Sequence, residues 1–135
     1  MYLYRYMSKK EFDKLVSYLP VEHNKKAFKA NTNSFGFCFL PETTTWEEYN
    51  GEKVTYTPDQ CYSFLSGIVS DELLVKFEVS EEAFKKFHKG YGVYCNPCDW
   101  DDTIKITEYC IDSYNRNELI PVAYCFPNEF VWYNI

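Results

Sequence analysis

The chain consists of short apolar segments with strand-like alternation, separated by three sequences that are typical of helix starts. The apolar segments predict strands at 2–6, 35–40, 73–79, 91–94, 104–111, 119–126 and 130–133. No repeat period and no low-complexity linker divides the chain. We therefore predict one α+β domain over residues 1–135, in which strands predominate and two to three helices are grouped around them.

Each predicted helix begins at a hydroxyl-bearing capping residue. Ser8 followed by Glu11 forms a capping box, and apolar residues at helical spacing then continue up to Pro20. The segment 57–60, Thr-Pro-Asp-Gln, predicts a second helix with threonine as N-cap and proline in the first turn. Ser80 opens a short third helix. Capping chemistry therefore predicts where three helices begin.

Polar stretches between these segments are predicted to be irregular connections. They cover 21–34, 42–56 with a tight turn at Asn50-Gly51, and the acidic cluster at 99–102, which we interpret as a solvated turn.

The charge balance of the chain argues against nucleic-acid binding that depends on phosphate contacts alone. With 14 basic and 20 acidic residues the formal charge is −6 and the isoelectric point is about 4.9, so sequence-independent nucleic-acid binding is disfavoured. No window approaches the roughly 18 apolar residues of a membrane span, and the first residues do not resemble a signal peptide. We expect a cytoplasmic protein without a membrane partner.

The six cysteines are expected to be reduced, because nothing in the sequence indicates an oxidising compartment. Cys95 and Cys98 form a CxxC pair without a second pair or a nearby histidine. A structural zinc site, a redox pair and two ordinary thiols are all compatible with it, and the last is favoured. Cys110 has no recognisable base for nucleophilic catalysis. No metal site is predicted.

Two charged residues occupy apolar rows. Alternation places Arg5 in phase with Leu3 and Met7, and Glu108 in phase with Ile106 and the other apolar positions of its segment. Charges at such positions are costly unless they pair with each other, are hydrogen-bonded or face a ligand. They predict either a structural ion pair or a cleft in which a cation holds phosphate and a carboxylate stabilises positive charge.

The order of features resembles the Arg-Ser-Glu class of ADP-ribosyltransferase-like domains, whose core is a split β-sheet. Arg5 ends a short first strand, a serine precedes the aromatic strand of Asn33–Phe39, and Glu108 lies in a late strand. In that family the first-strand arginine contacts the phosphates and ribose of NAD. The late glutamate stabilises the oxocarbenium-like transition state.

The resemblance implies further roles by position. Ser34 is the candidate for the middle motif, with Ser63 and Ser66 as weaker substitutes. Tyr62 and Phe64, or alternatively Tyr4 and Tyr6, offer aromatic faces to nicotinamide. Arg116, in the loop after the glutamate strand, is the candidate contact to the modified target.

One position departs from the family pattern. Ile106 stands where arginine-modifying members carry Glu or Gln. Three interpretations therefore stay open: the acceptor is not arginine, the group that engages the target comes from elsewhere in the chain, or the domain has lost transfer activity.

The resemblance predicts an NAD-dependent ADP-ribosyltransferase that modifies a protein target, such as a bacterial or phage effector. One alternative is a non-catalytic acidic interaction protein on the same scaffold that blocks a nucleic-acid or protein partner site. Another is a related enzyme that acts on an RNA phosphate or releases nicotinamide without an acceptor. Under the transferase hypothesis, Glu108 is the catalytic residue, and the residues that bind NAD are Arg5, Ser34, Tyr62 and Phe64.

Overall fold

The computed structural model describes residues 1–17, 21–22, 37–47, 51–61, 73–96, 99–126, 129 and 131–135. This part of the chain is mainly β with two short α-helices, which agrees with the predicted α+β class. Its elements in chain order are β1 (Tyr2–Met7), α1 (Lys9–Val16), β2 (Val21–Glu22), β3 (Phe37–Phe39), β4 (Thr44–Glu47), β5 (Lys53–Tyr56), the 3-10 turn η1 (Pro58–Cys61), β6 (Leu73–Val79), α3 (Glu81–Phe84), β7 (His88–Asn96), β8 (Asp99–Ile111), β9 (Ser113–Tyr114), β10 (Leu119–Cys125) and β11 (Tyr133–Asn134).

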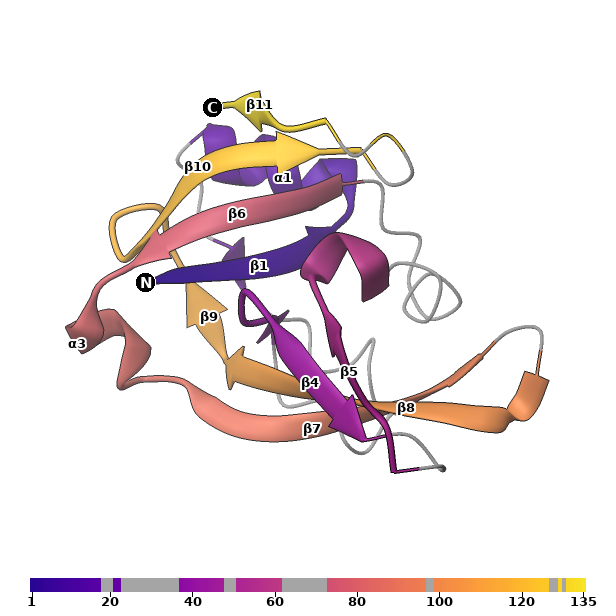
Figure 1. The fold of residues 1–135 in the computed structure, drawn as a ribbon. Coiled ribbons are helices and arrows are strands. Elements are labelled where there is room, and N and C mark those ends of the chain that lie inside the picture. Colours follow the sequence, from indigo (N-terminus) through magenta and orange to yellow (C-terminus); the bar gives the residue numbers. More distant parts are fainter. Residues whose placement is uncertain are drawn as a thin grey trace.

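Two antiparallel sheets dominate the described structure (Figure 1). The first has the strand order β1-β6-β10-β11, and the second has the order β3-β8-β7. They meet where Tyr4 of β1 and Leu40, just after β3, exchange backbone hydrogen bonds of 2.9 and 2.6 Å. This single bridge brings the strand that carries Arg5 beside the sheet that carries Glu108.

The buried apolar side chains form two clusters. The first core cluster comprises Leu3, Met7, Leu15, Phe37, Phe39, Leu73, Val75, Phe77, Val79, Ala83, Ile111, Tyr114 and Leu119. The second core cluster comprises Tyr4, Tyr6, Leu40, Leu74, Ile106 and Cys125. Alternate residues of β1 point to different clusters, because successive side chains of a strand leave opposite faces. The position of a residue in a strand therefore decides which cluster it joins.

The start of α1 confirms the predicted capping residue. The Ser8 hydroxyl accepts a hydrogen bond of 3.2 Å from the backbone N–H of Glu11. The helix ends at Val16, earlier than the apolar spacing predicted, and residues 18–20 lie outside the described chain. Phe12 packs on Tyr124 with ring centroids 5.3 Å apart, so α1 lies against β10.

The other two helix starts are also found, but each helix is shorter than predicted in the described residues. Ser80 caps the four-residue α3 by accepting from the Ala83 N–H at 3.2 Å. At η1 the Gln60 side chain accepts from the Thr57 N–H at 3.0 Å, and the described part is one 3-10 turn. The rest of the predicted second helix lies outside the described chain.

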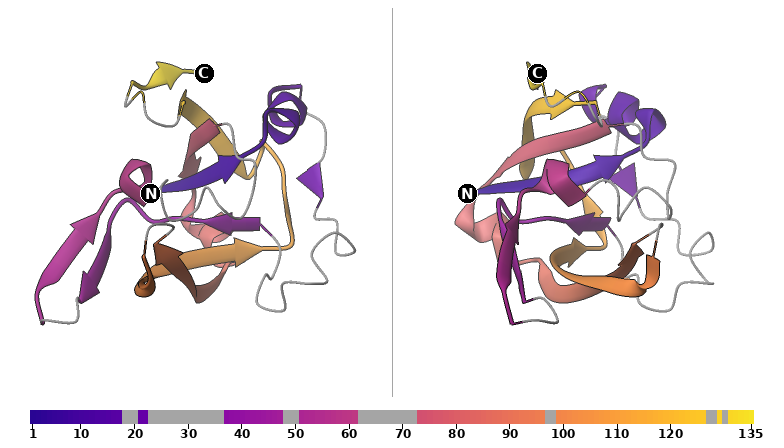
Figure 2. Two further views of the ribbon diagram at one scale, coloured as in Figure 1. Left: turned by 90° about the vertical axis from the view of Figure 1, so that its right-hand side faces the viewer. Right: turned by 45° about the vertical axis from the view of Figure 1, so that its right-hand side comes forward.

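The predictions for the polar connections were wrong at three places. Residues 44–56 contain the β4–β5 hairpin, in which Thr44 pairs with Tyr56, and Figure 2 shows this hairpin extending away from the two sheets. Its turn includes Gly51 at a φ of +84°, a conformation that favours glycine. The acidic residues 99–102 begin β8, and residues 21–22 pair with β9 as β2. Strand pairing overrides local polarity at these sites.

Within the described residues, no helix has the length and apolar character needed to cross a membrane.

Candidate functional site

Arg5 lies in a network of side chains that comes from β1, α1 and β9. Its Nε and Nη2 atoms donate to the two carboxylate oxygens of Glu11 at 2.8 and 2.9 Å, and its Nη1 donates to the backbone oxygen of Cys38 at 3.1 Å. The hydroxyl of Tyr114 donates to Glu11 at 2.6 Å. The Arg5 and Glu11 side chains are only 17% and 14% exposed. We call Arg5, Glu11 and Tyr114 the arginine network.

The surroundings of the arginine network favour the ionised guanidinium. Burial by itself lowers the pKa of Arg5, but the charge of Glu11 and its hydrogen bonds outweigh this effect and raise the pKa above its usual value. The guanidinium carbon also lies 4.8 Å from the centre of the Phe37 ring and 5.7 Å from that of Phe39. Burial and the Glu11 charge raise the pKa of Tyr114. Arg5 is therefore held as a charged partner of Glu11.

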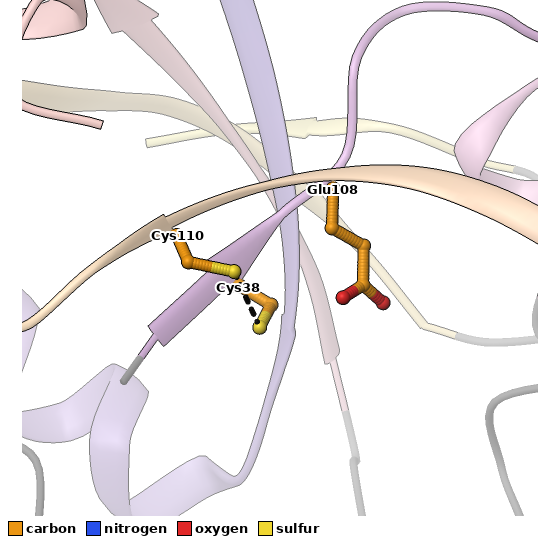
Figure 3. A group of neighbouring side chains, drawn as sticks. All are labelled: Cys38, Glu108 and Cys110. Carbon is orange, nitrogen blue, oxygen red and sulfur yellow. Dashed lines mark hydrogen bonds between the residues drawn. The ribbon is translucent and has the colours of Figure 1, made fainter. Parts of the chain in front are cut away.

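Glu108 lies in a second group of polar side chains (Figure 3). Its side chain, 8% exposed, leaves the same face of β8 as Ile106 and Cys110, as the alternation predicted. Cys110 pairs directly with Cys38 across β3 and β8, and their sulfur atoms are 3.1 Å apart. The two sulfurs and a Glu108 carboxylate oxygen lie within 4.8 Å of one another. We call Cys38, Glu108 and Cys110 the thiol–carboxylate cluster.

The two thiols do not ionise alike. Their hydrogen bond lowers the pKa of Cys110, whereas the same bond and then burial raise the pKa of Cys38. Glu108 acts to raise both values and Arg5 acts to lower both. The hydrogen bond between the two sulfurs therefore favours a state in which one thiol is ionised and the other keeps its proton.

The structure brings Arg5 and Glu108 to the same residue, Cys38, but from different sides. Arg5 lies over the rings of Phe37 and Phe39, which belong to the first core cluster. Cys38 alternates with those rings and faces Glu108 and Cys110. The two charges thus do not form the ion pair that was one expectation from the sequence, because Glu11 is the partner of Arg5.

The remaining predicted site residues are placed only in part. Ser34, Tyr62 and Phe64 lie outside the described residues. Arg116 lies in the turn between β9 and β10 and is partly exposed, directly after the strand that carries Tyr114 of the arginine network.

Sequence reasoning missed Glu11, Tyr114, Cys38 and Cys110 as members of these groups. The sequence pattern assigned Glu11 to the capping box. Its position in the first turn after β1 could have indicated a contact with Arg5, since that turn lies beside the strand it follows. Tyr114 and the cysteine pair carried no local signal, because their contacts depend on strand register.

Comparison of the chain with protein-family models, with curated proteins and with solved structures finds no match.

Proposed function

We propose that the protein is an NAD-dependent ADP-ribosyltransferase in which Glu108 is the catalytic carboxylate. The observation that carries this proposal is the burial of Glu108, a residue only 8% exposed, on the apolar face of β8. Cleavage of the bond between nicotinamide and ribose develops positive charge on the ribose. A fixed carboxylate in a water-poor site stabilises that charge more strongly in the transition state than in the ground state.

The proposal assigns nicotinamide to aromatic residues of the chain. Ile106, two residues before Glu108, shares the second core cluster with Tyr6, whose hydroxyl donates to the Pro58 carbonyl of η1. Tyr62 and Phe64, the aromatic residues assigned to nicotinamide, directly follow η1 in the sequence. The proposal therefore assigns Tyr62, Phe64 and Ser34 to NAD by their sequence positions.

Arg5 is assigned to the NAD phosphates. Glu11 and the Cys38 carbonyl accept from three of the five guanidinium N–H groups. A phosphate would be bound by the two that remain, one on Nη1 and one on Nη2. Arg116 is assigned to the protein target, because it is partly exposed and lies in the turn after β9, the strand that carries Tyr114 of the arginine network.

The test is incubation of the purified protein with labelled NAD and cell lysate. We expect label on a protein acceptor, and Glu108→Gln, which keeps the size of the side chain, should reduce the transfer rate by roughly 100- to 1000-fold. Glu118→Gln removes a carboxylate that pairs with Lys86 on the surface and is the matched control with unchanged transfer. Undiminished transfer by Glu108→Gln would remove Glu108 from the mechanism.

A second function is favoured by the contacts of Arg5. Because Glu11 and the Cys38 carbonyl already satisfy one edge of the guanidinium, the arginine network can serve a scaffold that binds no NAD. With its net charge of −6, such a scaffold would act as an acidic interaction protein that covers a basic partner surface. Calorimetry separates the two functions. Heat of NAD binding that is lost in Arg5→Lys supports the transferase, and absence of any heat from the folded protein supports the interaction protein.

A further inference from the structure

We propose that Cys38, Cys110 and Glu108 form a binding site for a thiophilic divalent cation, and that Zn²⁺ is the metal their chemistry fits. The proposal goes beyond the transferase function and does not depend on it, since metal binding needs neither NAD nor an acceptor.

The donor set is one that zinc uses in proteins. Thiolate sulfur and carboxylate oxygen are both zinc ligands, and three protein ligands with an open fourth position are typical of accessible zinc centres. Around a tetrahedral zinc two thiolate sulfurs lie about 3.8 Å apart, given zinc–sulfur bonds of about 2.3 Å. The sulfurs of Cys38 and Cys110 are 3.1 Å apart, and all three donor atoms lie within 4.8 Å of one another. Binding therefore requires the sulfurs to separate by less than about 1 Å.

The strands hold the three donors in place without a loop that must close. Cys110 is in register with Cys38 on the neighbouring strand, and Glu108 precedes Cys110 by two residues, so it leaves the same face of β8 (Figure 3). Sites built on paired strands are more rigid than sites on loops. The cluster thus presents its ligands with little ordering cost.

The charges around the cluster suit a divalent cation. Two thiolates and a carboxylate carry three negative charges, which a divalent ion reduces to one. Arg5, held by its Nη1 hydrogen bond to the Cys38 carbonyl, places a positive charge beside the strand that carries Cys38. The arginine network therefore acts on the cluster as a fixed outer charge.

A disulfide between Cys38 and Cys110 is the competing chemistry for the same sulfurs. It would need them to approach to about 2.05 Å, with two electrons passing to an oxidant, and it would make no use of Glu108. The metal site uses all three donor atoms at the distances observed, which is why we favour it.

The test is a titration of the reduced, chelator-treated protein with Zn²⁺ in competition with a chromophoric chelator, without NAD. Cys95→Ser/Cys98→Ser serves as the background so that the CxxC pair cannot bind the metal. We expect one Zn²⁺ per chain in this background, and the charge-transfer band of thiolate-bound cobalt when Co²⁺ replaces Zn²⁺. In the same background Cys125→Ser, which removes a buried thiol of the second core cluster, is the matched control with unchanged affinity.

Loss of a ligand should weaken binding sharply. Cys38→Ser and Cys110→Ser should each lower the affinity by at least about 100-fold, because loss of an outer-shell partner alone costs roughly 10- to 100-fold. Glu108→Gln should lower it by at least about 10-fold. Circular dichroism of each variant verifies the fold. Unchanged affinity in either serine variant, or formation of a Cys38–Cys110 disulfide by a protein that binds no Zn²⁺ when reduced, would overturn the proposal. Because Glu108 is also the proposed catalytic carboxylate, NAD transfer is measured separately, in metal-free protein.

Discussion

The arginine network and the thiol–carboxylate cluster meet at Cys38, whose backbone carbonyl accepts from Arg5 and whose sulfur belongs to the cluster. The two groups differ in how their buried charges are balanced. In the arginine network one cation meets one carboxylate through two hydrogen bonds, and Tyr114 adds a third donor to that carboxylate. The cluster instead contains three acidic groups, two thiols and a carboxylate, each of which is negatively charged when ionised. The arginine network therefore contains its own counter-charge, whereas the proposed zinc ion would supply a positive charge to the cluster.

This difference separates a structural role from a chemical one. A buried pair with matched charges resists change, because removing either partner leaves an uncompensated charge in a poor solvent. Side chains assembled for binding or catalysis commonly reduce stability rather than add to it. The arginine network should therefore dominate stability, and the thiol–carboxylate cluster should dominate binding.

The largest expected effect is on the arginine network. Glu11→Ala leaves the Arg5 guanidinium, 17% exposed, without its carboxylate and should lower the free energy of unfolding by about 3 kcal/mol. Urea denaturation followed by circular dichroism measures this change. Glu118→Gln, which breaks the exposed pair with Lys86, is the control and should cost less than about 1 kcal/mol. Equal losses in the two variants would mean that the arginine network is no more structural than a surface pair.

A smaller effect is expected from the thiol–carboxylate cluster. In metal-free protein, Cys110→Ala should lower the free energy of unfolding by about 1 kcal/mol, the scale of one buried apolar group. Cys125→Ala removes a thiol that is also buried but belongs to the second core cluster, and it should cost a similar amount. A loss at Cys110 that approaches the Glu11→Ala value would contradict the division between the two regions.

The smallest effect is a pH dependence that lies outside both regions. Burial, with a contribution from Glu42, raises the pKa of Tyr4 from 10.0 to about 12. Because the folded state holds this proton more tightly, the stabilisation is complete below pH 10 and is lost as the pH rises towards 12. Denaturation curves should show that Tyr4→Phe reduces the alkaline loss by less than about 1 kcal/mol at pH 11. An unchanged alkaline slope in Tyr4→Phe would show that other groups account for it.

Much of the fold follows from local sequence. The capping residues Ser8 and Ser80 begin helices, and the segments 2–6 and 73–79 form strands, because caps and alternation depend on neighbouring residues alone. The hairpin at 44–56 escaped prediction because its polar threonines resemble a connection until the two strands pair. Local reasoning thus failed mainly where pairing decided the structure.

The candidate site shows the same limit more sharply. Sequence by itself determined that Arg5 and Glu108 stand in apolar rows, since the period of a strand is a property of adjacent residues. Only the tertiary structure decided that Glu11 accepts from both Arg5 and Tyr114, and that Cys38 meets Cys110 across 72 positions of the chain. These contacts depend on which strands pair and in which register, and shifting a register by one residue would send every side chain to the other face.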